Sequence, residues 1–340
     1  MKDTGVQRYH CKNCGCTWYH KRQFGKLSVK TVIKIVFTYL RCLSYNRLRE
    51  IVYSWINHLI SKQQLIRFLE YIADRLPPLE KITDFYQPKR SGYVGLDGLW
   101  MKYRGTSFVI LIAFDVEVLD IIGYQVAWSE NEESWLKLFN KCSKCFQSPK
   151  GFYIDGMHDL VRAVKNNFPN IPIQLCVFHK EIRIGQIIPL VRLKTEEEKW
   201  LKEVFEIVLY SESEVTALRY FFKLKLIKTI DPTDKKKKIF GVLNRNFNLL
   251  MTHHSYPDMH RTNNVLEGFN GNISQKLDVM RGIKKFSNID RYLKLILLDY
   301  RFRKIRNSKD KCRNNKSPLE LAGCEDVPTF QHWIEKHLSK

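Results

Sequence analysis

The stretch SGYVGLDGLWMKYRGTSFVILIAFDVEVLDIIGYQVAW, residues 91–128, decides the fold. It contains three apolar runs that predict β-strands over 93–96, 106–114 and 120–127, with glycines near the turns between them. The middle run is almost continuously apolar, which is typical of a central strand buried on both faces. The first run ends at Asp97, so the segment predicts a sheet with a carboxylate at a strand end.

The chain then continues with helices alternating with strands. Amphipathic stretches predict helices over 131–145 and 160–168, and short apolar runs predict strands over 151–154 and 171–178. The fourth strand ends at Asp155 in GFYIDG. This order matches the α/β ribonuclease H-like fold, in which the first and fourth strands are neighbours in a mixed sheet. We therefore expect Asp97 and Asp155 side by side at the strand ends, where open α/β sheets carry their sites.

A third acid lies far downstream, in RTNNVLEGFN, residues 261–270. Glu267 stands at the start of a predicted helix that Asn263 or Asn264 caps. Two carboxylates at strand ends and a third on a helix are the oxygen ligands that a pair of Mg²⁺ or Mn²⁺ ions needs. Two such ions clamp the attacking and leaving oxygens of a phosphoryl displacement. The alternative for a single aspartate is a turn or helix-capping residue.

The chain is strongly basic. Its 340 residues include 57 Lys and Arg against 35 Asp and Glu, a formal net charge of +22. This excess favours a polyanionic partner, above all nucleic acid, over a merely Lys-rich composition. The longest apolar run, 108–114, is far shorter than the roughly 18 residues of a membrane span, so no membrane partner is expected. Nine cysteines and an N-terminus without a signal peptide predict reduced thiols in the cytoplasm.

Residues 1–27 predict a partial zinc-ribbon knuckle. Cys11 and Cys14 form a Cys-x-x-Cys pair in YHCKNCGCTWYHKRQF. Structural zinc takes four N or S ligands, usually from two such knuckles, and we expect the missing one upstream of Met1. Other ligands nearby would complete the site only awkwardly: Cys16, His10 and His20. The alternative is a vestigial knuckle that binds no zinc.

The region 28–78 predicts three short helices that follow the capping residues Ser28, Ser44 and Ser61. A tight turn between the second and third helices, with basic ends, is typical of a helix-turn-helix DNA-binding region. The alternative is a small bundle used only for packing. A proline pair then begins a linker to about residue 92. The expected DNA contacts are Arg41, Arg47, Arg49, Lys62 and Arg67.

The rest of the chain predicts an interrupted core. We expect the ribonuclease H-like core in 92–180, an all-helical insertion over 181–260, and the Glu-bearing helix with basic C-terminal helices in 261–340. Within the insertion, the lysines 235–238 predict a solvated loop. The stretch 300–316, YRFRKIRNSKDKCRNNK, interleaves aromatics with cations, as nucleic-acid-binding segments do. Its expected DNA contacts are Arg301, Arg303, Lys304 and Arg306.

The chain resembles a known family in five motifs. These are LDGLW around Asp97, YIDGMHDL around Asp155, LCVFHK at 175–180, RTNNVLEGFN around Glu267 and SPLELAG at 317–323. Over nearly its whole length it resembles the bacterial DDE transposases of the Mutator-like group. The resemblance implies that the two aspartates and the glutamate bind the catalytic metals and that the insertion is all-helical. The departure is at the N-terminus, where half of the zinc ribbon is absent.

The resemblance also implies that Cys176 and His179, a Cys-x-x-His pair after the last strand, lie near the active site. The alternatives are a core thiol with a hydrogen-bonded histidine, or a zinc site with other ligands, although no second pair at suitable spacing is evident. His158, close after Asp155, and Asn264, on the Glu-bearing helix, are further candidates near the metals.

Together these expectations describe a DNA transposase that cleaves at its element's ends and transfers the freed strand into target DNA. Two alternatives stay open: a catalytically silent DNA-binding derivative, and a nuclease of the same fold without strand transfer. The resemblance and the joining of two DNA ends imply a homodimer or higher oligomer on double-stranded DNA, at the nucleoid of the bacterial cytoplasm.

Overall fold

The computed structural model describes residues 8–10, 12, 14, 17–19, 27–41, 44–146, 148–279 and 286–338. The chain divides into two compact units. The helical unit comprises Met1–Ile82, Gln275–Arg303 and Asp326–Lys340. The sheet unit comprises Thr83–Ser274 and Lys304–Glu325.

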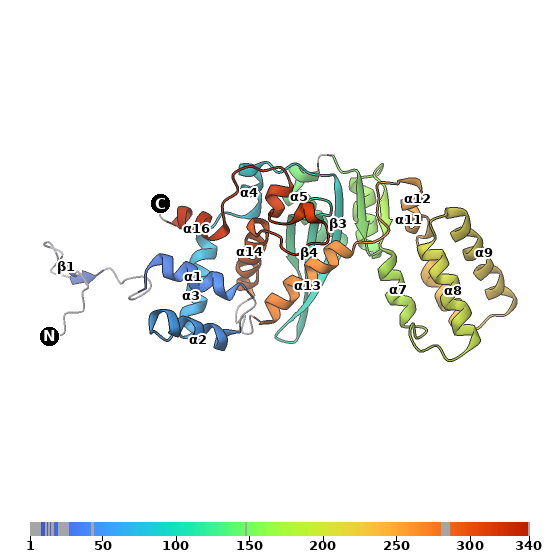
Figure 1. Cartoon of the computed structure of the whole chain (residues 1–340), viewed down its shortest axis with the longest axis horizontal. Coiled ribbons are helices and arrows are strands. Elements are labelled where there is room, and N and C mark those ends of the chain that lie inside the picture. The colour runs from blue at the N-terminus through green and yellow to red at the C-terminus, as the bar shows by residue number, and fades with distance from the viewer. Residues whose placement is uncertain are drawn as a thin grey trace. The chain divides into compact units, whose positions relative to one another are not determined.

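A mixed five-stranded sheet forms the centre of the sheet unit, with the order β5-β4-β3-β6-β7 (Figure 1). The strands are β3 (Tyr93–Tyr103), β4 (Thr106–Asp115), β5 (Asp120–Ala127), β6 (Gly151–Ile154) and β7 (Ile173–Leu175). The first three are antiparallel, and β6 runs parallel to β3 and to β7. The first and fourth strands of the predicted core, β3 and β6, are neighbours as expected, since Gly95 of β3 pairs with Tyr153 of β6.

Two strand boundaries differ from the prediction. β3 does not end at Asp97, because its pairing with β4 continues to a turn where Arg104 and Gly105 both have positive φ. Such a turn matches the twist of a hairpin. At the other side of the sheet β7 ends early, since Val177 already belongs to helix α7 (Val177–Gly185). Asp97 therefore lies within β3, just past the point where pairing with β6 stops.

Helices pack on the sheet through their apolar stripes. α5 (Glu132–Lys141), with η1 (Ser143–Phe146) after it, and α6 (His158–Asn167) bury residues such as Trp135 and Leu160 in the core. Gly123 of β5 permits a close approach, because a Cβ there would lie 2.1 Å from the Sγ of Cys142. Cys142 is thus a packed thiol at the end of α5.

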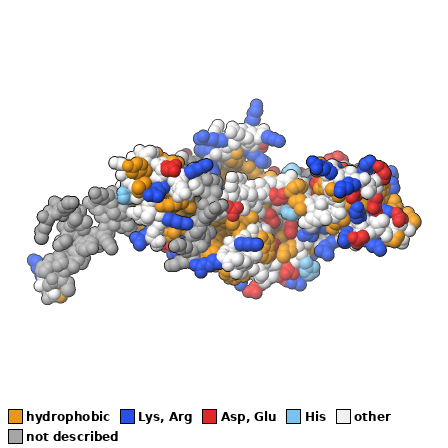
Figure 2. Space-filling model, turned by 90° about the horizontal axis from the view of Figure 1, so that it is seen from below, with side chains coloured by type: hydrophobic (Ala, Val, Ile, Leu, Met, Phe, Trp, Pro, Cys, Tyr) orange, Lys and Arg blue, Asp and Glu red, His pale blue; other side chains and the backbone are white. Residues whose placement is uncertain are grey.

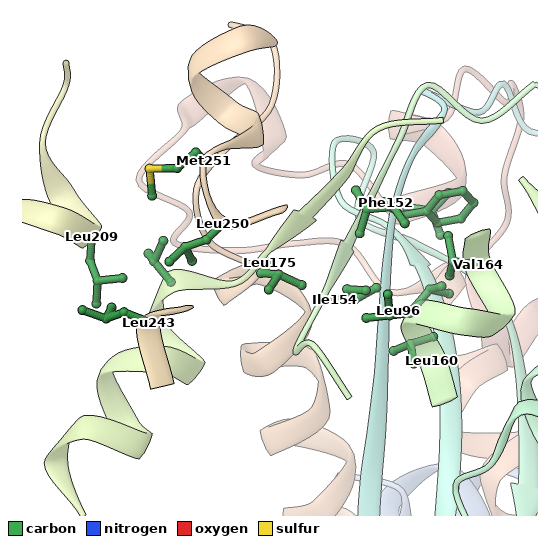
Figure 3. Close-up of a cluster of buried hydrophobic side chains, with 14 of the residues drawn as sticks. Leu96, Phe152, Ile154, Leu160, Val164, Leu175, Leu209, Leu243, Leu250 and Met251 are labelled. Carbon is green, nitrogen blue, oxygen red and sulfur yellow. The ribbon is translucent and has the colours of Figure 1, made fainter. Parts of the chain in front are cut away.

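The insertion is helical throughout its ordered elements, as expected. It contains α8 (Glu196–Tyr210), α9 (Glu214–Ile230), α10 (Asp234–Asn244), α11 (Phe247–Leu250) and α12 (Thr252–Ser255). Its core continues that of the sheet. Figure 3 shows Leu96, Phe152 and Ile154 of the sheet followed by Leu175, and then by Leu250, Leu243 and Leu209 of the insertion.

The prediction of a solvated loop at the Lys run was wrong. Lys235 to Lys238 lie in the first half of α10, which Thr233 caps by accepting the N–H of Lys236. Lys236 is buried and its Nζ pairs with Asp231, with Glu197 3.7 Å away. The run is helical because the capping threonine and paired acids offset the repulsion among the lysines.

The helical unit contains α1 (Val29–Tyr39), α2 (Tyr45–Ile56), α3 (Lys62–Arg75), α14 (Ser287–Phe302) and α16 (Phe330–Leu338). The predicted caps are confirmed: Ser28, Ser44 and Ser61 each accept a backbone N–H, and Ser61 forms a capping box with Gln64. Aromatic rings of Phe302, Phe330 and Trp333 stack between α14 and α16. At the N-terminus β1 (Arg8–His10) pairs with β2 (Thr17–Tyr19).

Three further helices complete the described chain. The expected linker contains α4 (Leu79–Tyr86), whose Leu79 and Ile82 are buried, so that part of the linker prediction was wrong. α13 (Asn264–Val279) carries Glu267, and α15 (Pro318–Leu321) follows a short η2 turn (Lys311–Arg313). Among the described residues no helix has the length and apolarity needed to cross a membrane.

Candidate active site

Asp97 and Asp155 occupy equivalent positions on neighbouring parallel strands. The last paired residues of β3 and β6 are Gly95 and Tyr153, and each aspartate lies two residues further on. The carboxylate of Asp97 accepts the N–H of Gly98 at 2.9 Å. That of Asp155 accepts the N–H of Met157 at 2.8 Å. Backbone donors therefore hold both carboxylates at the edge where β6 ends.

Like charge accumulates here. Burial raises the pKa of Asp97, His179 counteracts this, and the neighbouring Asp155 raises it further. The positive group nearest to Asp155 is Arg183 of α7, with Nη2 3.9 Å from Oδ2. A cation bound beside Asp97 would favour its ionised form.

Glu267 lies in the first turn of α13. Three residues further along this helix, the Nδ2 of Asn270 donates to Oδ2 of Asp97 at 2.7 Å, which ties α13 to β3. Asn270 is buried, and its own Oδ1 has no hydrogen-bond partner among the described residues. An unpaired oxygen beside carboxylates suits a hard divalent cation or its water. The oxygens of Asp97, Asp155 and Asn270 are thus of the kind that Mg²⁺ prefers, whereas the contacts of the Glu267 carboxylate among the described residues are with Cys176 and His179.

Cys176 and His179 lie against Glu267. The Sγ of Cys176 donates to Oε1 of Glu267 at 3.3 Å, and the Nδ1 of His179 lies 3.4 Å from the same oxygen. Cys176 is fully buried just after β7, and its sulfur also accepts the N–H of Asn263 at 3.3 Å. Burial raises the pKa of the Cys176 thiol to about 12. The pair therefore anchors the side chain of Glu267 and the start of α13.

The other two predicted neighbours lie at the surface. His158 is the first residue of α6; its side chain is 84% exposed and approaches Asp159. Asn264 is exposed on α13. The preceding residue, Asn263, is the buried one: a Cβ on Gly95 would lie 2.6 Å from its Oδ1. Asn263 is therefore the asparagine that packs on the sheet.

Glu130 is a site residue that the sequence reasoning missed. It precedes α5, is 9% exposed, and accepts the indole N–H of Trp100 at 3.0 Å. Gly98 leaves room for it, since a Cβ there would lie 2.5 Å from its Oε2. Burial, then the charge of Asp155, raises the pKa of Glu130 to about 7. In the sequence, Glu130 looks like the acids of the first turn of α5, Glu132 and Glu133. Only its position in the folded structure sets it apart.

The expected DNA contacts differ in exposure. Arg41, Arg47, Arg49, Lys62, Arg67, Lys304 and Arg306 are exposed. Arg301 is fully buried at the end of α14, where its Nη1 donates to the carbonyl of Leu79, so its side chain has no surface for DNA and that expectation is corrected. Arg303 is partly exposed and pairs with buried Asp299. Lys304 pairs with Glu320 at 2.9 Å.

The predicted zinc knuckle lies partly outside the described residues. Cys11 is not among the described residues, while Cys14 is exposed. The expected zinc knuckle at Cys11 and Cys14 therefore stays a prediction.

The comparison with protein families identifies the chain. The family model of Mutator family transposases matches residues 20–304. Since this is most of its length, the chain belongs to the Mutator family of transposases. No curated protein matches it.

Proposed function

We propose that this protein is a DNA transposase with a ribonuclease H-like core, which cleaves the ends of its element and joins them to target DNA in a metal-dependent reaction. The observation that carries the proposal is the grouping around Asp97. Asp155 follows the adjacent parallel strand, and Asn270, on the helix that bears Glu267, donates to the Asp97 carboxylate.

The reaction has two displacements at phosphorus. Water first attacks a phosphodiester at the element's end, and the bond to the 3′-oxygen breaks to leave a 3′-hydroxyl. That hydroxyl then attacks a target phosphodiester, forming a new P–O bond as another breaks. Two Mg²⁺ ions, or Mn²⁺, held by Asp97, Asp155 and Glu267 would supply Lewis-acid stabilisation and an activated nucleophile.

The chain's own residues orient these groups. The N–H groups of Gly98 and Met157 each hold one carboxylate oxygen of the two aspartates in place. The hydrogen bond from Asn270 fixes the Asp97 carboxylate relative to α13. Arg183, half-exposed beside Asp155, is available to hold a phosphate oxygen.

Binding of double-stranded DNA is proposed for the basic surfaces. In the helical unit, α1 to α3 form the proposed helix-turn-helix region, and its exposed cations include Arg47, Arg49, Lys62 and Arg67. The net charge of +22 supports backbone contact along an extended duplex. Synapsis of two ends requires at least a homodimer on DNA.

The test is a cleavage and strand-transfer assay on a labelled duplex that carries the sequence flanking the gene, with Mg²⁺ or EDTA. Wild-type protein should give metal-dependent nicks and joined products. Asp97→Asn and Glu267→Gln should give neither, while binding the duplex normally. Asp159→Asn, which alters a partly exposed acid of α6 paired with Arg162, is the matched control and should stay active.

Each other result identifies an alternative. Equal cleavage by Asp97→Asn would remove that residue from the reaction. Binding without cleavage by the wild type would identify a silent DNA-binding derivative. Nicks without joined products would identify a nuclease.

A further inference from the structure

Three side chains of different chemistry converge next to the carboxylates. Cys176 from the end of β7, His179 from the first turn of α7 and Glu267 from α13 each offer one atom, and the three atoms lie within 4.8 Å of one another. This is a mixed sulfur, nitrogen and oxygen set, unlike the all-oxygen set of the aspartates.

The distances fit a tetrahedral metal centre. Zinc binds thiolate at about 2.3 Å and imidazole or carboxylate at about 2.0–2.2 Å, so two ligands at a tetrahedral angle lie about 3.3–3.6 Å apart. The Sγ of Cys176 and the Nδ1 of His179 lie 3.3 and 3.4 Å from Oε1 of Glu267. Two edges of such a tetrahedron are thus already formed by the protein.

The surroundings prepare these atoms as ligands. The Nδ1 of His179 is buried and has no hydrogen-bond partner among the described residues. The Sγ of Cys176 accepts a hydrogen bond from the backbone N–H of Asn263, and the backbone N–H of His179 is a second donor to this sulfur. These contacts fix the sulfur of Cys176 beside the carboxylate of Glu267. Three ligands and an open fourth position are the pattern of a reactive zinc site.

We propose that Cys176, His179 and Glu267 form a binding site for a thiophilic divalent cation, Zn²⁺ in the first place, distinct in chemistry from the Mg²⁺ pair. Soft sulfur and imidazole ligands select Zn²⁺ over Mg²⁺, which prefers oxygen. Cys176 must lose its proton as the metal enters, so each metal bound releases a proton to the solvent.

The site shares Glu267 with the proposed catalytic set. A zinc ion there holds the carboxylate of Glu267 against Cys176 and His179 and withdraws it from the aspartates. Zn²⁺ should therefore inhibit Mg²⁺-dependent cleavage, a consequence that rests on the proposed function. Binding itself does not rest on it.

Cobalt reports on the site without any reaction. Full-length protein in a Cys11→Ser/Cys14→Ser background is titrated with Co²⁺ under anaerobic conditions, and absorption from thiolate-to-cobalt charge transfer is recorded. We expect one saturable band that Zn²⁺ abolishes by displacing Co²⁺. Cys176→Ser should remove the band, and Glu267→Gln, nearly identical in shape, should weaken Co²⁺ binding at least about tenfold.

Cys324→Ser is the matched control, since this partly buried thiol of the sheet unit contacts the carbonyl of Tyr86 instead. It should keep the band. The proposal is overturned if wild-type protein shows no band, or if the band survives Cys176→Ser. If Cys176→Ser does not fold by circular dichroism, undiminished affinity in Glu267→Gln overturns it. Absence of Mg²⁺-dependent cleavage without zinc counts against the proposed function alone, because the spectrum still decides the metal site.

Discussion

Two regions of the sheet unit bury charge in opposite ways. In the helical insertion, Glu198 is 5% exposed and its Oε1 lies 2.8 Å from the Nζ of Lys235. That hydrogen bond lowers the pKa of Glu198 to about 2. Glu130 is buried to a similar degree beside Asp97 and Asp155, and its pKa rises to about 7.

The difference lies in the charged groups that surround each buried acid. On the face in Figure 2, basic and acidic side chains lie interspersed over the insertion. Its buried Glu198 pairs with Lys235. At the strand edge, Glu130 and Asp97 have other carboxylates among their charged neighbours, and both have a raised pKa. The predictions below test this contrast.

The largest effect should come from Asp97→Asn. We expect cleavage to fall by about a thousandfold or more, as when a metal contact worth several kcal/mol is lost. In EDTA the same variant should melt at a higher temperature than wild type, because a raised pKa marks an aspartate whose charge opposes folding. The side-chain amide of Asn270, whose Oδ1 has no hydrogen-bond partner among the described residues, can rotate so that this oxygen accepts a hydrogen bond from the new amide at position 97. Thermal melts at pH 8 check this, and a lower midpoint would contradict it.

Glu130→Gln should change the pH dependence of stability. The folded-state pKa is raised from 4.5 to about 7, so the folded state binds the proton more tightly than the unfolded state does. Wild-type stability in EDTA should therefore fall by roughly 3 kcal/mol as pH rises from 4.5 to about 7, and level off above. The variant should lack this decline. Urea unfolding at a series of pH values across that range measures the free energy of unfolding. If it changes with pH equally in the two proteins, the pKa of Glu130 is not raised by folding.

Glu198→Gln should show the opposite sign. Its folded-state pKa is lowered from 4.5 to about 2, so the stabilisation is present above pH 4.5 and is lost as pH falls toward 2. We expect the variant to melt a few degrees below wild type at pH 7, with the gap closing in acid. A gap that is independent of pH would show that packing, not charge, holds Glu198.

The smallest effect should follow Trp100→Phe. Loss of the indole N–H, which favours the ionised form of Glu130, should raise the pKa of that carboxyl by about half a unit to one unit. The pH at which stability levels off should move up accordingly. Leu99→Ile, on the adjacent position of β3, is the control that should leave it unchanged.

Local signals predicted much of this molecule. Capping serines and apolar stripes located α1, α2 and α3, and the apolar runs located all five strands of the sheet. The prediction that Asp97 and Asp155 follow neighbouring strands came from the order of strands and helices, which matches the ribonuclease H-like fold, and β3 does pair with β6. Local sequence patterns could not predict contacts between residues that are far apart in the sequence. The burial of Glu130 depends on its packing against Gly98, more than thirty positions away in the chain. Arg301 has the sequence context of a surface cation, but it is buried in the folded structure.

The unbroken apolar core of Figure 3 has a consequence for how the sheet unit opens. Leu175 of β7, Leu250 and Leu243 belong to one buried cluster, so the insertion cannot separate from the sheet without exposing both. The two should therefore unfold as one cooperative block. Amides of α8 and of β6 should then exchange with solvent at similar rates in native-state hydrogen exchange, well below the rates of the loops around them.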